Sequence, residues 1–456
     1  MRPAANPLPS VVRQVAAGRS AVRWRVFTML CVASFVAFVL RTNMSIAQER
    51  MTTDLGLTKV QLGWVMAAFA WGYALFQLPG GIWGDRLGAR GSLTVIVTAW
   101  GVLNLLIGLA PGPEHAPPWV VLGVLMLLRA LMGAAQAPLC PVGSGALTLW
   151  FPATSWGNAN RLLSVAMTLG ASATGPLIAW LMDATNWRLS FVLTVPLAFL
   201  TAAVWWRHAR DTPAEHPDVR TDELEIIRSN RGFRAAGRAK GDWRAVVGDR
   251  QVQLLTGSYF CSNYVFYFFF NWLFDYLVNH RGLKTLEGGL YAMAPWMAGA
   301  VGAFLGGLAC DRLTRRVGLG RGCRWPAMAG LVLSGILIVA AGRAGNPLLA
   351  VVLLSVCLAC AQFTEASYWT ATIAVSGPDA FVAGGVLNTG GNLVGGFCAL
   401  LVPLTVQALG WEIALVTAAL FALLGAAMWL GIRADRGPEA GVPGRGNTQR
   451  HHRVPL

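Results

Sequence analysis

The sequence predicts an all-α membrane protein in which twelve transmembrane helices form two six-helix, pseudo-symmetric halves. Composition, the length of the apolar runs and an internal repeat each favour this fold class. Of the 456 residues, 55% are hydrophobic and only 12% are charged, whereas an average soluble domain has about 25% charged residues. The mean hydropathy is +0.53. A water-soluble fold could not bury this much apolar surface, so lipid is expected to be the solvent.

Apolar runs long enough to cross a membrane recur along the whole chain. A hydrocarbon layer about 30 Å thick requires about 20 apolar residues per helical crossing. The predicted spans are 24–46, 60–82, 91–111, 118–140, 160–182, 188–206, 251–278, 287–310, 325–342, 347–374, 381–407 and 411–432. These runs are continuously apolar and do not alternate, which excludes a transmembrane β-barrel.

The basic residues predict how the spans are oriented. Lys and Arg gather in the first 25 residues, between the sixth and seventh spans, and after the last span; such clusters mark the cytoplasmic side. We therefore expect a multi-pass protein of a bacterial-type inner membrane with both termini in the cytoplasm. The formal net charge of +15 then reflects topology and predicts no nucleic-acid partner. The predicted parts are a cytoplasmic tail at 1–23, a helical bundle at 24–206, a cytoplasmic linker at 207–250, a second bundle at 251–432 and a disordered cytoplasmic tail at 433–456.

The residue inventory argues against several other kinds of function. All six histidines fall outside the predicted spans, and seven of the eight cysteines fall in or at the edges of spans, where they act as small apolar residues. No metal site and no cofactor is therefore expected. The sequence lacks a GxxxxGK[ST] phosphate loop, so ATP is not expected to drive the protein. It also lacks the His/Asp/Ser constellation or filter-like loop of a membrane enzyme or channel. A membrane sensor remains an open alternative to a carrier, and a monomer is expected.

An internal repeat divides the chain into halves. The sequence GGIWGDRLGAR at 80–90, after the second span, corresponds to GGLACDRLTRR at 306–316, after the eighth span. Repetition about half a chain apart predicts two six-helix units in parallel orientation. Glycines let the helices approach closely, and the Asp and Arg side chains can clamp the short loop through charge-assisted hydrogen bonds. The predicted gating motif consists of Gly81, Asp85, Arg86, Gly88, Arg90, Asp311 and Arg312.

Several motifs resemble one family of transporters. The loop pattern GxxxDRxGxR at 81–90 is similar to the signature loop of the major facilitator superfamily. Within that superfamily, LRTNMS at 40–45, AWGYALFQLPGG at 70–81 and GGNLVGG at 390–396 resemble the anion:cation symporter family. The likeness covers residues 24–430. It implies a secondary carrier that works by alternating access, in a family that includes hexuronate, galactonate, glucarate and phthalate carriers.

Two arginines are the leading candidates for binding an anionic substrate. Arg41 lies near the outer end of the first predicted span and Arg129 in the middle of the fourth. A cation in hydrocarbon costs about 2.5–3.5 kcal/mol on insertion scales, so an intramembrane arginine favours a functional role. The planar guanidinium group of arginine can hold a carboxylate by two hydrogen bonds. The alternative is that Arg41 extends to the outer surface and Arg129 braces a neighbouring helix.

Polar and aromatic groups at membrane depth complete the predicted binding set. Polar groups buried in lipid need hydrogen-bonding partners, which a hydroxylated substrate could supply. The family resemblance implies that Tyr73 and Asn392 line a sugar-acid site. The seventh span adds Tyr259 and Asn263, and the tenth adds Trp369, which could stack on a substrate. Helix packing is the alternative for each of these residues.

Two departures from the family pattern concern energy coupling. Bacterial members commonly carry acids where this chain has Leu40 and Gln136, and neither of these side chains can carry a proton. Gln136 is kept among the predicted substrate-binding residues. Glu365 is the only glutamate placed deep inside a predicted span, and it is the candidate for proton coupling; a permanent ion pair or a helix-packing bond is the alternative. Asp275 is expected to be solvated near the outer end of the seventh span.

Together these observations predict a secondary transporter that imports a small organic anion, most simply a sugar acid or another hydroxylated carboxylate. Protons are the candidate coupling ion, and membrane lipid is the surrounding partner. An uncoupled facilitator, or an anion exchanger for aromatic or dicarboxylic acids, remains an open alternative.

Overall fold

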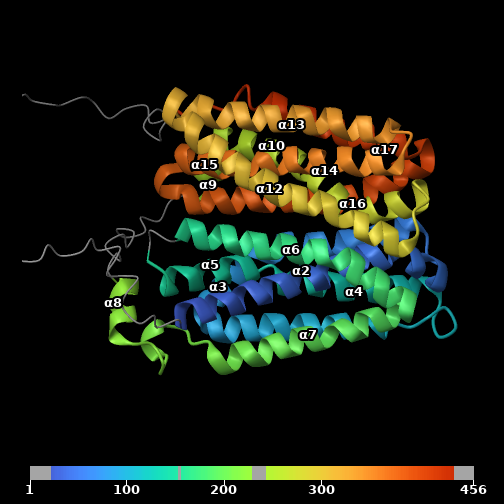
Figure 1. The fold of residues 1–456 in the computed structure, drawn as a ribbon, viewed down its shortest axis with the longest axis horizontal. Helices are drawn as coiled ribbons and strands as arrows, with labels where there is room; N and C mark the ends of the chain where they lie inside the picture. The colour runs from blue at the N-terminus through green and yellow to red at the C-terminus, as the bar shows by residue number, and fades with distance from the viewer. Residues whose placement is uncertain (1–21, 153–155, 229–242, 436–456) are drawn as a thin grey trace, which may run out of the picture.

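A computed structural model describes residues 22–152, 156–228 and 243–435 of the chain (Figure 1). Within these residues the regular structure is entirely helical. Ten helices are long and apolar enough to cross a membrane. The two remaining predicted spans, 60–82 and 251–278, are also helical and belong to the same bundle. The predicted all-α membrane fold is therefore confirmed, whereas the two terminal tails lie largely outside the described residues.

The helices fall into two groups that lie one above the other in Figure 1. The first group is α2 (Val22–Leu55), α3 (Lys59–Gly108), α4 (Pro118–Gln136), α5 (Leu139–Trp150), α6 (Trp156–Ala184) and α7 (Trp187–His208). Along the chain, the two groups are linked by η2 (Pro213–Glu215), α8 (Thr221–Arg228) and α9 (Trp243–Gly248). The second group is α10 (Arg250–Asn271), α11 (Leu273–Asp275), η4 (Tyr276–His280), α12 (Thr285–Val317), α13 (Leu319–Arg343), α14 (Pro347–Phe363), α15 (Glu365–Ser376), η5 (Gly377–Asp379), α16 (Ala380–Leu409) and α17 (Trp411–Met428). We call them the first and second halves.

Several of the predicted spans are not one separate, unbroken helix. The second and third spans follow one another within α3, which breaks at Gly88, where φ is 73° and ψ is 169°; glycine adopts this conformation without a Cβ penalty. The fourth span divides into α4 and α5 at Pro138, which has no backbone N–H to donate and so weakens the helical hydrogen bonding there. The tenth divides into α14 and α15 at Thr364, whose hydroxyl donates to the Ala361 carbonyl oxygen at 2.7 Å and so competes with the backbone ladder.

The two halves meet along two pairs of helices, α3 with α16 and α6 with α12. Glycines make the second contact possible. A Cβ on Gly175 would lie 2.5 Å from the carbonyl oxygen of Gly289, and a Cβ on Gly289 would lie 2.7 Å from that of Gly175. Both distances are too short for any larger residue, so the backbones of α6 and α12 touch directly.

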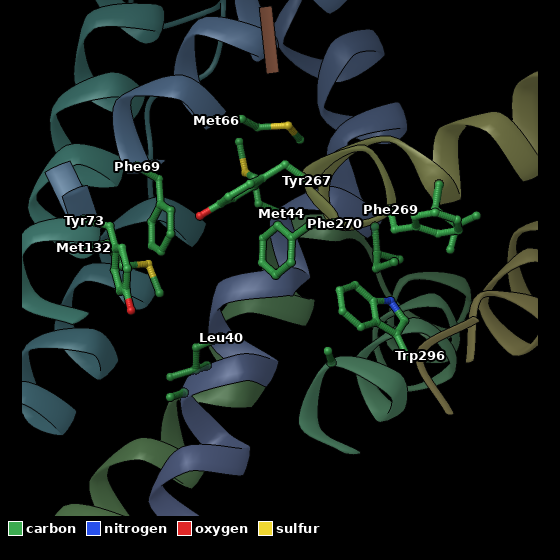
Figure 2. Close-up of a cluster of buried hydrophobic side chains, with 14 of the residues drawn as sticks. Leu40, Met44, Met66, Phe69, Tyr73, Met132, Tyr267, Phe269, Phe270 and Trp296 are labelled. Carbon is green, nitrogen blue, oxygen red and sulfur yellow. The ribbon is translucent and has the colours of Figure 1, made fainter. Parts of the chain in front are cut away.

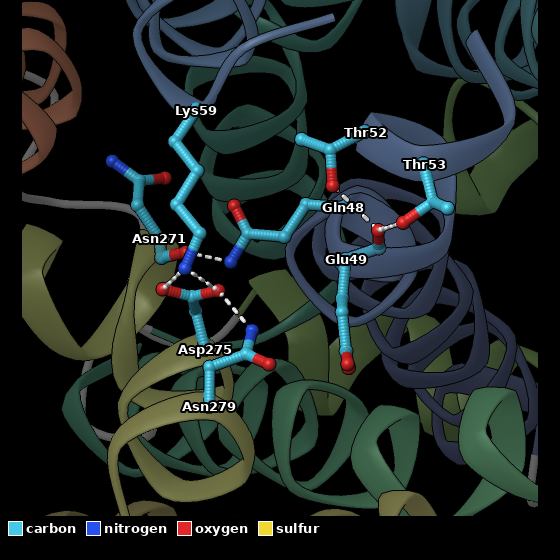
Figure 3. Close-up of polar contacts among 8 residues, drawn as sticks. All are labelled: Gln48, Glu49, Thr52, Thr53, Lys59, Asn271, Asp275 and Asn279. Atoms are coloured by element: carbon cyan, nitrogen blue, oxygen red, sulfur yellow. Dashed lines mark hydrogen bonds and ion pairs between the residues drawn. The ribbon is translucent and has the colours of Figure 1, made fainter. Parts of the chain in front are cut away.

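A group of polar contacts joins the halves at the end of the bundle where α2 turns into α3 (Figure 3). The Nζ of Lys59 lies 2.9 Å from both carboxylate oxygens of Asp275, and Asn279 donates to Asp275 at 2.6 Å. Nearby, the Nε2 of Gln48 donates to the Asn271 carbonyl oxygen at 3.1 Å. The expectation that Asp275 is solvated is therefore wrong: its side chain is 1% exposed, because a lysine from the other half covers and neutralises it.

Asp275→Asn should loosen this end of the bundle. The substitution removes the charge that holds Lys59. Because Lys59 is partly exposed, the contact between the halves loses about 1 kcal/mol. This loss multiplies by about five the ratio of molecules in which this end of the bundle has separated to molecules in which it is closed. Distance distributions between spin labels on Glu114 and Gly345, in exposed loops of the two halves, would report the change. Asp183→Asn is the matched control, since it breaks the Arg50 ion pair within the first half. An equal shift in both variants would contradict a role for Asp275 between the halves.

Candidate substrate site

The guanidinium group of Arg41 lies inside the bundle among aromatic rings. Its side chain is only 5% exposed, and its central carbon lies between 4.6 and 5.9 Å from five ring centroids. These rings belong to Phe38, Phe69, Tyr73, Tyr267 and Phe270. One N–H group donates to the Tyr267 hydroxyl at 3.1 Å, while the Nε is buried without a hydrogen bond. The cation is thus held by ring faces and by one neutral oxygen.

Arg129 lies next to Arg41, and its guanidinium group is also buried against an aromatic ring. It is 2% exposed, and its guanidinium carbon is 4.6 Å from the Phe69 centroid. It donates weakly to the Arg41 carbonyl oxygen at 3.4 Å and contacts the Sδ of Met132 at 3.6 Å. Its Nε also has no hydrogen bond. Within the described part of the chain, no carboxylate forms an ion pair with either arginine.

Apolar side chains surround this pair (Figure 2). Leu40, Met44 and Met132 are fully buried in the same cluster, and the Tyr267 hydroxyl points toward the side on which Phe69 and Tyr73 lie. The dielectric constant of such an environment is low, which strengthens any ionic contact made there. The site can therefore bind an acid group strongly, provided that the group arrives from outside the protein.

A chain of hydrogen bonds leads from Arg41 across both halves. Arg41 on α2 donates to Tyr267 on α10, and the Tyr267 hydroxyl donates to Asn392 on α16 at 2.8 Å. Asn392 donates to the Asn388 side chain at 3.1 Å, and Asn388 donates to the Oε1 of Gln77 on α3 at 2.8 Å. The chain starts in the first half, passes through the second and returns to the first. A ligand that changes the bonding of Arg41 therefore acts on contacts between the halves.

A second polar cluster lies where α14 meets α15. The Oε1 of Glu365 accepts hydrogen bonds from the Tyr259 hydroxyl at 2.9 Å and from the Trp369 indole at 2.7 Å. Glu365 is half-buried, and no Lys or Arg among the described residues forms an ion pair with it. The permanent ion pair considered from the sequence is therefore not found in this part of the chain. Asn263 lies one turn further along α10 and donates to the Tyr259 carbonyl oxygen at 3.0 Å.

The predicted binding residues thus separate into two clusters. Arg41, Tyr73, Arg129 and Asn392 lie in or directly beside the arginine site, and Tyr259, Trp369 and Glu365 form the second cluster. Gln136 bonds to α2 through the Ala37 carbonyl oxygen at 3.0 Å, and its Oε1 has no partner. The Tyr73 hydroxyl is 3.9 Å from the Sγ of Cys140. The roles of these residues in substrate binding stay predictions.

Tyr267 is the main site residue outside the predicted binding set, although it is one of the polar residues of the seventh span. A periodicity of four would have identified it, because Tyr259, Asn263 and Tyr267 recur at the spacing of one helical face. Tyr264 lies on another face, where its ring stacks on Phe421 with centroids 4.1 Å apart. The polar residues of the seventh span therefore divide into a face that carries the hydrogen-bond chain and one that packs.

The predicted gating loop is clamped from outside the motif. A Cβ on Gly88 would lie 2.3 Å from the Asp211 carboxylate, which accepts a hydrogen bond from the Arg90 backbone N–H at 2.8 Å. The Arg90 guanidinium donates twice to the Trp206 carbonyl oxygen, at 2.8 and 3.0 Å, and lies 4.1 Å from the Trp206 ring centroid. The clamp therefore fixes the end of α7 to the turn inside α3.

The second half contains a similar clamp at the corresponding place. Arg324 donates to the Ile432 carbonyl oxygen just beyond α17, and Gly320 faces the Asp435 carboxylate. The two clamps occupy similar places in the two halves, although Gly320 and Arg324 lie beyond the repeated segment, in which Thr314 and Arg316 correspond to Gly88 and Arg90.

The other residues of the motif take no visible part in the clamp. Arg86, Asp311 and Arg312 are exposed and form no ion pair within the described part of the chain. The side-chain surroundings of Gly81 and Asp85 lie outside the described residues. Of the predicted motif, Gly88 and Arg90 therefore carry the observed contacts.

Fold and site together define a polytopic membrane protein of two helical halves with a cationic centre beside their contact. Comparison with known proteins identifies the family. The Major Facilitator Superfamily model matches residues 30–383, so the chain belongs to this superfamily of transporters.

Several named relatives agree with this assignment. A probable sulfoacetate transporter of Cupriavidus necator is 31% identical over 83% of this chain and 86% of its own length. A D-galactonate transporter of Escherichia coli is 27% identical, covering 91% and 96% of the two chains. A probable galactarate/D-glucarate transporter of Bacillus subtilis is 29% identical, covering 86% and 87%. These relatives are transporters rather than enzymes.

The fold also resembles a solved structure. A bacterial homologue of the human lysosomal transporter Spinster, crystallised in an inward-facing and occupied conformation, aligns with a TM-score of 0.71 at 18% identity, covering 92% of this chain and 98% of that one. At this level of identity the likeness concerns the fold alone.

Arg90→Ala should destabilise the protein by about 1 kcal/mol, because it removes two charge-assisted hydrogen bonds and a ring contact at a partly exposed site. Unfolding of the purified protein by SDS in mixed micelles would measure the change. Arg86→Ala removes an exposed arginine of the same loop and should leave stability unaltered. If the two variants lose equal stability, the Trp206 clamp does not stabilise the fold.

Proposed function

We propose that the protein is a secondary active transporter that imports a small organic anion, a sugar acid or another hydroxylated carboxylate, by alternating access. The observation that carries this proposal is the pair of buried arginines without a carboxylate partner. The named relatives support the class of substrate, since they are transporters of sulfoacetate, galactonate, and galactarate or glucarate. The alternative is a facilitator or exchanger for aromatic or dicarboxylic acids.

Electrostatics explain why the site favours an anion. A buried cation is costly, and ring faces recover only about 0.5–2 kcal/mol per contact. An incoming carboxylate would replace the neutral Tyr267 hydroxyl with a charged acceptor, which forms hydrogen bonds about twice as strong. Tyr267 and Asn392 would then be free to bond to substrate hydroxyls. Arg41 attracts the acid group, and these neighbours select the rest of the molecule.

The contacts between the halves suggest how binding is coupled to movement. Substrate would break the hydrogen bond between Arg41 and Tyr267. This bond is the first of the hydrogen-bond chain that ends at Gln77. With that connection changed, the halves can rock about the α3–α16 and α6–α12 contacts. We assign the end closed by Lys59 and Asp275 to the outside of a bacterial-type inner membrane and both termini to the cytoplasm, because the basic residues of the chain gather on the opposite side.

Glu365 is the proposed site of proton coupling. Its carboxylate lies inside the second half, is held by two neutral donors and has no cation beside it among the described residues, so no ion pair fixes its charge. The acids common in relatives are replaced here by Leu40 and Gln136. Uncoupled transport or exchange is the alternative, and it needs no titrating group.

Arg41→Ala should weaken substrate binding by more than about tenfold, because the acid group loses its charged partner. Arg41→Lys should restore only part of the affinity, since the lysine ammonium keeps the positive charge but cannot bind a carboxylate by two parallel hydrogen bonds. Calorimetry with the purified protein and a carboxylate that the wild type binds would measure both. Wild-type affinity in Arg41→Ala, with the protein folded, would contradict the proposed site.

Glu365→Gln should abolish uphill uptake driven by an imposed pH gradient, because an amide cannot cycle between protonation states. Exchange of substrate across the membrane should continue, since it requires only that the loaded carrier reorients. Proteoliposomes with the membrane potential clamped allow both measurements on one preparation. Accumulation that persists in Glu365→Gln would remove this residue from coupling, and a wild type that never accumulates substrate would favour the uncoupled alternative.

A further inference from the structure

The arginine site contains more positive charge than its surroundings balance. Arg41 and Arg129 are both buried, and within the described part of the chain no carboxylate pairs with either. Both guanidinium groups lie against the same Phe69 ring. Two like charges in an apolar environment repel each other strongly unless an anion joins them.

Neighbouring positions that could have carried an acid are occupied by uncharged residues. Leu40, directly before Arg41, is fully buried. Met132, one turn beyond Arg129, presents its thioether to the guanidinium at 3.6 Å. Gln136, a further turn along α4, has an amide where a carboxylate of the same shape would fit, and its buried Oε1 has no partner. The protein itself supplies no negative charge at these positions.

We propose, resting on the transport function above, that the substrate is a diacid with two ionised groups, one bound by Arg41 and the other by Arg129. A monoacid would leave one buried cation uncompensated. A dianion would bring the net charge of the pair and its ligand to zero. The class includes dicarboxylates and molecules that carry one carboxylate and one sulfonate.

The geometry allows one small molecule to contact both arginines. Their guanidinium carbons lie 5.1 and 4.6 Å from the centroid of the same Phe69 ring. The two cations are therefore no farther apart than the sum of these distances, which the two ends of a short diacid can span. Each also has a buried Nε–H without an acceptor, so each can donate a further bond. The surrounding rings attract the cations but carry no formal charge, and so do not replace an anion.

Matched pairs of ligands test this inference. Galactarate and galactonate share a hydroxylated carbon skeleton and differ in whether the last carbon is a carboxylate or an alcohol. Phthalate and benzoate, and succinate and butyrate, make the same comparison without hydroxyl groups. We expect calorimetry on the purified full-length protein at neutral pH to give at least about tenfold tighter binding of the diacid in any pair that binds. Arg129→Gln should reduce this ratio to about one, and Arg129→Lys should keep most of it.

Two further variants test the charge balance without removing an arginine. Met132→Glu would place a carboxylate at the position where the thioether now contacts Arg129, so the diacid preference should be lost. Met132→Gln has the same size without the charge and should keep the preference. Equal binding of diacid and monoacid by the wild type, or a ratio unchanged in both Arg129→Gln and Met132→Glu, would overturn this inference alone. Failure of every acid to bind would overturn the proposed function as well.

Discussion

A guanidinium group buried without a carboxylate is the interaction on which the rest of this structure depends. Insertion of such a cation costs about 2.5–3.5 kcal/mol, and the protein offsets this with five aromatic rings and the Tyr267 hydroxyl around Arg41. These groups come from α2 and α3 of the first half and from α10 of the second, so the site joins the two halves. A carboxylate of the protein that paired with Arg41 would compete with an anionic ligand for the charge. Neutral partners keep the site folded and still able to bind an anion.

The same arginine is the first member of a polar chain that joins the halves, so binding and conformation share one set of bonds. Tyr267, Asn392 and Asn388 carry the chain through the second half, and Gln77 returns it to the first. At one end of the bundle, Lys59 and Asp275 hold the halves together independently of the site. A ligand can shift an equilibrium between two conformations only through contacts that differ between them. The bond between Arg41 and Tyr267 is such a contact in the mechanism that we propose.

Much of the fold was predictable from the sequence, because lipid forces continuous apolar runs and the repeat at 80–90 and 306–316 divides them into halves. Arg41 and Arg129 were predictable for the same reason, since an intramembrane cation stands out. Contacts between distant residues were not. Lys59 and Asp275 belong to different halves, and nothing local to either shows that they pair, so Asp275 was wrongly expected to be solvated. The partners of Gly88 and Arg90 likewise come from Trp206 and Asp211, beyond the motif that drew attention to the loop.

The most direct test of the central claim is whether the formal charge of a ligand, and not its shape, determines binding. Thermal unfolding of the purified protein should be measured with an organic acid that stabilises it and with the amide of that acid, which has nearly the same shape and no charge. A ligand that binds the folded state raises its stability, and the increase grows with the logarithm of concentration over Kd. We expect the acid to raise the unfolding temperature and the amide to leave it unchanged. Equal stabilisation by the two compounds would contradict a site built around unpaired arginines.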